Sequence, residues 1–202
     1  METFEEKEYN GREWKGLALR GELVRGRVFD SCKFSKCSFR EVEFTECKFR
    51  GCTFRNCDFG MAHLKGSEIS ETRFEGCQLI GVNWTETTWE KGVFLKPADF
   101  TKCTLNHSSF LGLNLRKVNL TRCTAQDVDF AEANLSGADC SYTDFLDSRF
   151  LHTDLSEADF TGAQNYAISP TQNTLKKTKF SLPEAMALLY GLDIVLTEYT
   201  SN

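Results

Sequence analysis

The sequence predicts a solenoid, because large apolar residues recur at every fifth position over most of the chain. From Phe29 it reads FDSCK FSKCS FREVE FTECK FRGCT FRNCD F, and each pentad starts with phenylalanine. After one slip the period resumes at Phe100 and continues to Phe160. A period of five matches neither the period of a strand nor that of a helix. A chain that turns the same face inward every five residues is a coil with flat sides, in which each pentapeptide forms one side and one corner.

A second, small residue lies two positions before each large apolar residue, which we call the centre of its pentad. The small residue is predicted to point inward where the corner brings the backbone close. These positions hold Cys32, Cys37, Cys47, Cys52, Cys57, Thr72, Cys77, Ala98, Cys103, Ser108, Cys123, Ala133, Ala138 and Ala158. Eight of the nine cysteines occupy such positions and Cys140 is a centre, so packing accounts for all of them as buried, reduced thiols. Metal sites favour short paired spacings with histidine, whereas a spacing of five places successive cysteines on different sides of the coil.

The two ends of the chain depart from the repeat. Residues 1–28 keep the phase, but their inward positions carry charged side chains, which predicts a degenerate first coil that closes the end of the solenoid. The repeat itself is predicted over 29–163, with a register slip at 95–99. Because Pro97 cannot donate to a β-ladder, the slip is either a projecting bulge or a tolerated insertion of one residue. Trp84 and Trp89 are larger than most centres and mark either a locally widened or partly exposed coil, or core packing with some distortion.

Residues 164–202 are predicted to form a turn, a short helix and a tail. Ser181 and Glu184 form a capping box, Pro183 suits the first turn, and Gly191 suits the position just after the last turn. The apolar residues of this segment cover too much of the helix for a lone surface helix, so they predict a cap on the last coil and a two-fold dimer. A monomer with a well-buried cap is the alternative. The predicted dimer interface is Leu182, Met186, Leu189, Leu192, Ile194 and Leu196.

Negative charge is concentrated in one segment of the repeat. The net charge of the chain is −5, but residues 124–163 carry nine acidic residues and one base, Arg149. The segment is either an anionic surface for a basic partner or, for each Asp just before a centre, a way to hydrogen-bond the backbone of the corner. The second explanation does not cover the acids at other positions: Asp127, Glu132, Asp147 and Glu157.

The repeat resembles that of the pentapeptide-repeat proteins. The resemblance implies an all-β fold, a right-handed quadrilateral parallel β-helix with four pentapeptides in each 20-residue coil. Centres 20 residues apart should then stack. The predicted columns are Phe34, Phe54, Phe74 and Phe94; Phe110, Phe130 and Phe150; and Leu115, Leu135 and Leu155.

A narrower resemblance is to the topoisomerase-protecting branch of this family, which includes albicidin-resistance and Qnr quinolone-resistance proteins. It is carried by GVNWT at 81–85, by Trp89, by 180–185 and by 192–194. The resemblance implies a dimeric rod that mimics DNA, binds DNA gyrase (the GyrA/GyrB complex) and counters antibiotics or toxins that trap the enzyme on DNA. The Qnr proteins carry longer loops than the short insertion at 95–99. The implied contacts are an anionic surface of Asp127, Asp129, Asp139, Asp147 and Asp159, and a bulge contact of Trp89, Leu95, Lys96 and Pro97.

Other functions are less consistent with the sequence. There is no phosphate-binding loop, metal constellation or catalytic triad, and the three histidines are scattered, so we expect neither an enzyme nor a cofactor. The start of the chain has no secretory signal and no stretch is apolar enough to span a membrane, which predicts a cytoplasmic protein. We expect no direct binding of nucleic acid. An interaction scaffold with an unrelated protein partner is the remaining alternative.

Overall fold

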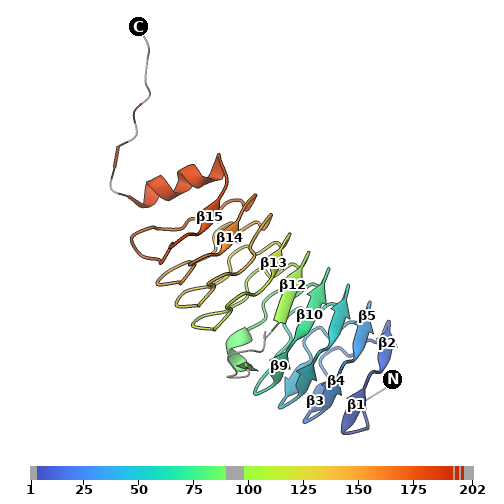
Figure 1. Ribbon diagram of the computed structural model, residues 1–202. Coiled ribbons are helices and arrows are strands. Elements are labelled where there is room, and N and C mark those ends of the chain that lie inside the picture. The colour runs from blue at the N-terminus through green and yellow to red at the C-terminus, as the bar shows by residue number, and fades with distance from the viewer. Residues whose placement is uncertain (1–3, 90–97, 193, 196, 198–202) are drawn as a thin grey trace.

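The computed structural model describes residues 4–89, 98–192, 194, 195 and 197. They form a rod of stacked rectangular coils, with the N-terminal coil at one end and a short helix at the other (Figure 1). Strands of successive coils pair in parallel, and residues 20 positions apart are partners, as for Tyr9 with Phe29 and Phe29 with Phe49. The predicted parallel β-helix with four pentapeptides per coil is therefore confirmed.

The coil has four sides, which we call A to D in chain order. Side A is a five-stranded sheet of β1 (Glu8–Asn10), β4 (Val28–Asp30), β7 (Lys48–Arg50), β9 (Glu68–Ser70) and β11 (Thr88–Trp89). Side B holds β2 (Glu13–Lys15), β5 (Lys33–Ser35), β8 (Thr53–Arg55), β10 (Thr72–Glu75), β12 (Ala98–Thr101) and β13 (Leu120–Thr121), followed by β14 (Asp159–Phe160) paired with β15 (Lys179–Phe180). Side C is joined by isolated parallel bridges from Ala18 to Gln164. Side D contains β3 (Leu23–Arg25) paired with β6 (Glu43–Thr45), and then isolated bridges.

The centres form columns of stacked rings inside the rod. Phe54 stacks on Phe34 with ring centroids 4.7 Å apart, and on Phe74 at 5.0 Å. Each full burial of such a side chain contributes about 1.5–3 kcal/mol, and a favourable ring pair adds about 1 kcal/mol. The second predicted aromatic column is also confirmed, because Phe130 stacks on both Phe110 and Phe150 at 5.3 Å.

The fourth member predicted for the first column is wrong. Phe74 pairs with Phe100, 26 residues later, rather than with Phe94, which lies outside the described residues. The insertion is therefore six residues long rather than one. The sequence period cannot distinguish the two, because an insertion of six residues shifts a five-residue pattern by the same one position.

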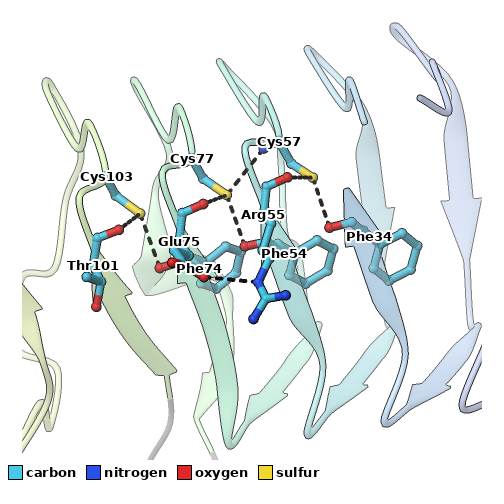
Figure 2. A network of polar contacts seen from close by, with 9 residues as sticks. All are labelled: Phe34, Phe54, Arg55, Cys57, Phe74, Glu75, Cys77, Thr101 and Cys103. Carbon is cyan, nitrogen blue, oxygen red and sulfur yellow. Dashed lines mark hydrogen bonds and ion pairs between the residues drawn. The ribbon is translucent and has the colours of Figure 1, made fainter. Parts of the chain in front are cut away.

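The inner corner positions supply hydrogen-bond donors as well as small volume. The thiols of Cys57, Cys77 and Cys103 lie one above another in successive coils (Figure 2). Cys57 Sγ donates to the carbonyl oxygen of Phe34 at 3.5 Å, and Ser67 Oγ makes the equivalent bond to Phe44 at 3.0 Å. All nine cysteines are buried and unpaired, in agreement with the packing prediction. The neighbouring thiol in the next coil, followed by burial, raises the pKa of Cys77 and Cys103 to about 12, so both thiols stay protonated.

The rod is closed differently at its two ends. At the N-terminal end the ring of Phe4 covers the core, with its centroid 4.9 Å from that of Phe29. At the other end Phe180 packs on Phe160 at 5.4 Å, and Leu188 of the helix packs against the core. The cap thereby removes the last apolar ring from water.

The predicted short C-terminal helix is present, as the 3₁₀ helix η2 (Glu184–Gly191), but its predicted ends are wrong. No side chain caps its start; instead Ser181 Oγ accepts the N–H of Gly162 at 2.9 Å, which ties the segment to the preceding coil. Gly191 is the last helical residue rather than the one after it. A Cβ at this position would lie 2.9 Å from Ser169 Cα, so the close approach of backbone, rather than a left-handed turn, explains the glycine.

Candidate protein-binding surface

The five acids predicted to form one anionic surface occupy three places on the rod. Asp139 and Asp159 are bridge partners in neighbouring coils on side B. Asp129 lies on side D, and Asp127 and Asp147 lie at the corner between sides C and D in successive coils. The acids therefore surround this half of the rod, and only two pairs of them follow one another along its axis.

Three of these carboxylates hydrogen-bond the backbone of their own corner. Asp129 accepts the N–H of Ala131 at 3.0 Å, Asp139 that of Ser141 at 3.1 Å, and Asp159 that of Thr161 at 2.9 Å. The alternative explanation offered by the sequence, a structural role for each Asp just before a centre, is therefore correct for these three residues.

Neutral asparagine makes the same hydrogen bond at equivalent corners of the coil. Asn119, the bridge partner of Asp139, accepts the N–H of Thr121 at 2.9 Å, and Asn134 accepts that of Ser136 at 2.9 Å. An amide oxygen is sufficient for this turn, so the negative charge of aspartate is not needed for it. The charge at these positions is a property of the surface rather than a requirement of the fold.

Four other acids of the segment lie at corners with left-handed backbone. Asp127, Glu132, Asp147 and Glu157 have φ between 53° and 61°. Glycine occupies the equivalent corner in several other coils, and asparagine or aspartate tolerates it better than most residues do. Glutamate has no such advantage, so the backbone conformation does not explain Glu132 and Glu157.

Basic side chains lie beside some of the acids and not others. Asp127 Oδ2 lies 2.8 Å from His107 Nδ1, Asp129 Oδ2 lies 3.6 Å from Arg149, and Asp159 Oδ2 lies 3.1 Å from Lys179 Nζ. Burial opposes ionisation of Asp159, but hydrogen bonds from Thr161 and the Lys179 ammonium outweigh it and hold the pKa of Asp159 below its usual value. Among the described residues neither Asp139 nor Asp147 has a basic partner within ion-pair distance.

The predicted bulge contact falls mostly outside the described residues. Leu95, Lys96 and Pro97 are among the residues not described, and Trp89 is placed by its backbone, which pairs with Ile69. Trp84 is fully buried, begins the 3₁₀ turn η1 (Trp84–Glu86) and stacks on Phe110 at 5.6 Å. The burial of Trp84 contradicts a partly exposed site, and the 3₁₀ turn is a local distortion of the coil.

The C-terminal segment exposes a row of apolar side chains. Leu182 and Met186 are exposed, as is Ile194, while Leu189 and Leu192 are half-buried and Leu196 lies outside the described residues. Sequence reasoning missed Tyr190, which is 81% exposed. Its place within the apolar segment 182–192 was the signal that could have found it.

A family model agrees with this architecture. The model for the pentapeptide repeat region matches residues 28–96 and 88–160, which is more than half of the chain. The chain belongs to the pentapeptide-repeat family.

Solved structures of this family superpose on the rod at low sequence identity. This pentapeptide-repeat protein is similar to QnrB1, a plasmid-mediated fluoroquinolone resistance protein, in one of its trypsin-treated variant forms: the TM-score is 0.71 at 19% identity, over 95% of this chain and 99% of that one. For full-length QnrB1 the TM-score is 0.58 at 21% identity, over 90% of this chain and 100% of that one. These likenesses show the shared fold. No curated protein matches in sequence.

Two further classes of site find no support in the described part of the rod. No three histidine, cysteine, aspartate or glutamate side chains there are grouped so that they can hold a metal ion. No described helix is both long and apolar enough to cross a membrane.

Proposed function

We propose that this pentapeptide-repeat protein is a DNA-mimicking binding protein that interacts with DNA gyrase and protects it from antibiotics or toxins that trap it on DNA. The observation that carries the proposal is the surplus charge of the C-terminal half. Aspartate stands at corner positions where asparagine makes the same hydrogen bond in neighbouring coils, as for Asp139 and Asn119. The structural likeness to QnrB1 is consistent with this function.

The proposed mechanism is electrostatic competition. A basic protein surface that binds duplex DNA gains much of its affinity from neutralising phosphates and releasing their counterions. A rod that carries carboxylates around its circumference supplies fixed negative charge to the same basic groups, and it does so without a nucleic acid. Binding of this kind weakens steeply with added salt, and no catalytic step is required of the rod.

Dimerisation is the second part of the proposal. The row of Leu182, Met186 and Tyr190 leaves apolar surface in water beside the capped end of the rod. A two-fold contact between copies would bury both rows and join two rods end to end, with half-buried Leu189 and Leu192 at its edge. Sedimentation of the purified chain tests this: Met186→Asp should give the monomer if the row is the interface.

The predicted bulge contact stays a proposal. Trp89 belongs to β11, the last strand of the side A sheet, and Leu95, Lys96 and Pro97 come in the sequence between it and β12, where the pairing of Phe74 with Phe100 requires six extra residues.

The deciding experiment is DNA supercoiling by purified gyrase, with and without a gyrase poison, in the presence of this protein. The proposal expects a change in at least one condition, and no change in either would overturn it. Asp139→Asn should reduce the effect, because it removes a charge and keeps the hydrogen bond to Ser141. Asp58→Asn is the matched control: Asp58 makes the same bond, to the N–H of Gly60 at 2.8 Å, but lies in the other half of the rod.

An interaction scaffold for an unrelated protein is the competing function, since fold alone does not determine activity. Affinity capture that recovers a different protein and no gyrase would favour it.

A further inference from the structure

Arg149 is the single base among ten charged residues in the acidic segment 124–163. It lies on side D, where its neighbours along the axis are Asp129 and then Ser109. Its guanidinium Nη1 is 3.6 Å from Asp129 Oδ2, and its side chain is 58% exposed.

The fold does not depend on this ion pair. Asp129 already accepts the N–H of Ala131 at 3.0 Å, which holds its carboxylate in place without Arg149. An exposed pair at this distance contributes little to stability, about 0–1 kcal/mol. The same position in the two preceding coils is held by Ser109 and Asp129, so the backbone has no preference for a cation there.

A cation in the middle of an anionic surface has a definite consequence for binding. A basic partner that covers Asp129 must either displace Arg149 or bring a base next to it, and both are unfavourable unless the partner places an acceptor or an acidic group opposite Arg149. A uniform polycation cannot meet this condition, whereas a patterned protein surface can.

We infer that Arg149 is a specificity-determining residue, which disfavours non-specific polycations relative to the cognate basic surface. The inference rests on the proposed function, since it takes the acidic half of the rod as the contact. Within residues 124–163 Arg149 is the one base. Lys179 pairs with Asp159 from beyond the segment, and Arg122, just before the segment, lies over the ring of Tyr142 at 4.7 Å.

The test compares two affinities of each variant, for purified DNA gyrase and for poly-lysine, at one fixed low salt concentration. Arg149→Gln should tighten poly-lysine binding about three- to fivefold, the upper range expected for an exposed charge pair. Gyrase binding should stay unchanged or weaken, so the ratio of the two affinities shifts towards poly-lysine.

Two control variants separate this effect from net charge and from misfolding. Arg55→Gln removes an equivalent exposed arginine, paired with Glu75 at 3.0 Å in the other half of the rod, and should leave the ratio unchanged. Arg149→Lys retains the charge and should also leave it unchanged. Thermal melts of each variant serve to check that it is folded.

The outcomes are distinguishable. Suppose that the unmodified protein binds gyrase. If Arg149→Gln then leaves the ratio of affinities unchanged, or Arg55→Gln shifts it equally, the role of Arg149 is refuted and the proposed function stands. If the unmodified protein does not bind gyrase, the proposed function is refuted and this inference with it.

Discussion

The N-terminal and C-terminal halves of the rod obey the same packing rule and differ in the charge of their surfaces. In the N-terminal half, charges of opposite sign pair between neighbouring coils, as in Lys33 with Glu13 at 2.7 Å and Arg55 with Glu75 at 3.0 Å. In the C-terminal half, aspartates follow aspartates, as in the bridge between Asp139 and Asp159. Like charges at the spacing of adjacent strands repel, so the second arrangement gives up stability that the first retains.

The difference shows which positions of the repeat are free to vary. In every coil the centres must fill the core and the inner corners must hold small residues, whereas the outward positions need only be compatible with the turn. Asp58 and Asp139 make equivalent backbone bonds in the two halves, yet Asp58 lies 3.6 Å from Arg40 and Asp139 has no such partner among the described residues. The outward positions are therefore the ones that can differ between members for the sake of function.

The largest expected effect is on the free energy of unfolding, and it tests whether the cores of the two halves contribute equally to stability. Phe54→Ala removes a ring stacked on both sides and should lower the free energy of unfolding by about 3–5 kcal/mol. Phe130→Ala should cost a similar amount, because Phe130 is stacked in the same way in the other half. Denaturant titration followed by tryptophan fluorescence measures both. A cost below about 1 kcal/mol in one half alone would show that the cores are not equivalent.

The next effect concerns the surfaces. Asp139→Lys combined with Asp159→Lys reverses two charges on side B and should weaken gyrase binding at least about tenfold, a change of about 1.4 kcal/mol. Lysine cannot accept the N–H of Ser141 or Thr161, so the thermal midpoint should fall by several degrees while the variant stays folded. Inhibition or protection that persists unchanged in a folded double variant would place the contact elsewhere on the rod.

A smaller effect concerns the inner corner donors. Cys57→Ser retains a donor to the Phe34 carbonyl, as Ser67 does for Phe44, and should be close to neutral. Cys57→Ala removes the donor and should cost about 1 kcal/mol. Equal stability of the two variants in denaturant titrations would mean that volume alone matters at this position.

The smallest effect is a pH dependence at Asp159, in the acidic half. The pKa of Asp159 is lowered in the folded protein, so its ionised form contributes stability above the unfolded pKa of about 3.9 and loses it as the pH falls through the folded value. Asp159→Asn keeps an acceptor for Thr161 and does not titrate. The variant should be less stable than the parent near neutral pH and should lose that disadvantage at about pH 2, as measured by thermal melts. A constant difference across this range would contradict the assignment.

Much of the interior could be predicted from sequence, because every coil places a large apolar residue at each centre and a small residue at each inner corner. The Phe34 to Phe74 column and the inward cysteines are correct for this reason. The length of the insertion after Trp89 was not accessible, since five extra residues leave the phase of the repeat unchanged. The ends of η2 were also wrong, because Ser181 and Gly191 serve contacts with Gly162 and Ser169, which lie far from them in the sequence.

The sequence by itself determined that the chain coils every five residues and that negative charge gathers between 124 and 163, because apolar period and charge are local properties of the chain. Only the tertiary structure decided how that charge is arranged. The stacking of coils brings residues 20 positions apart side by side. It therefore places Asp129 beside Arg149 and leaves Asp139 without a cation among the described residues.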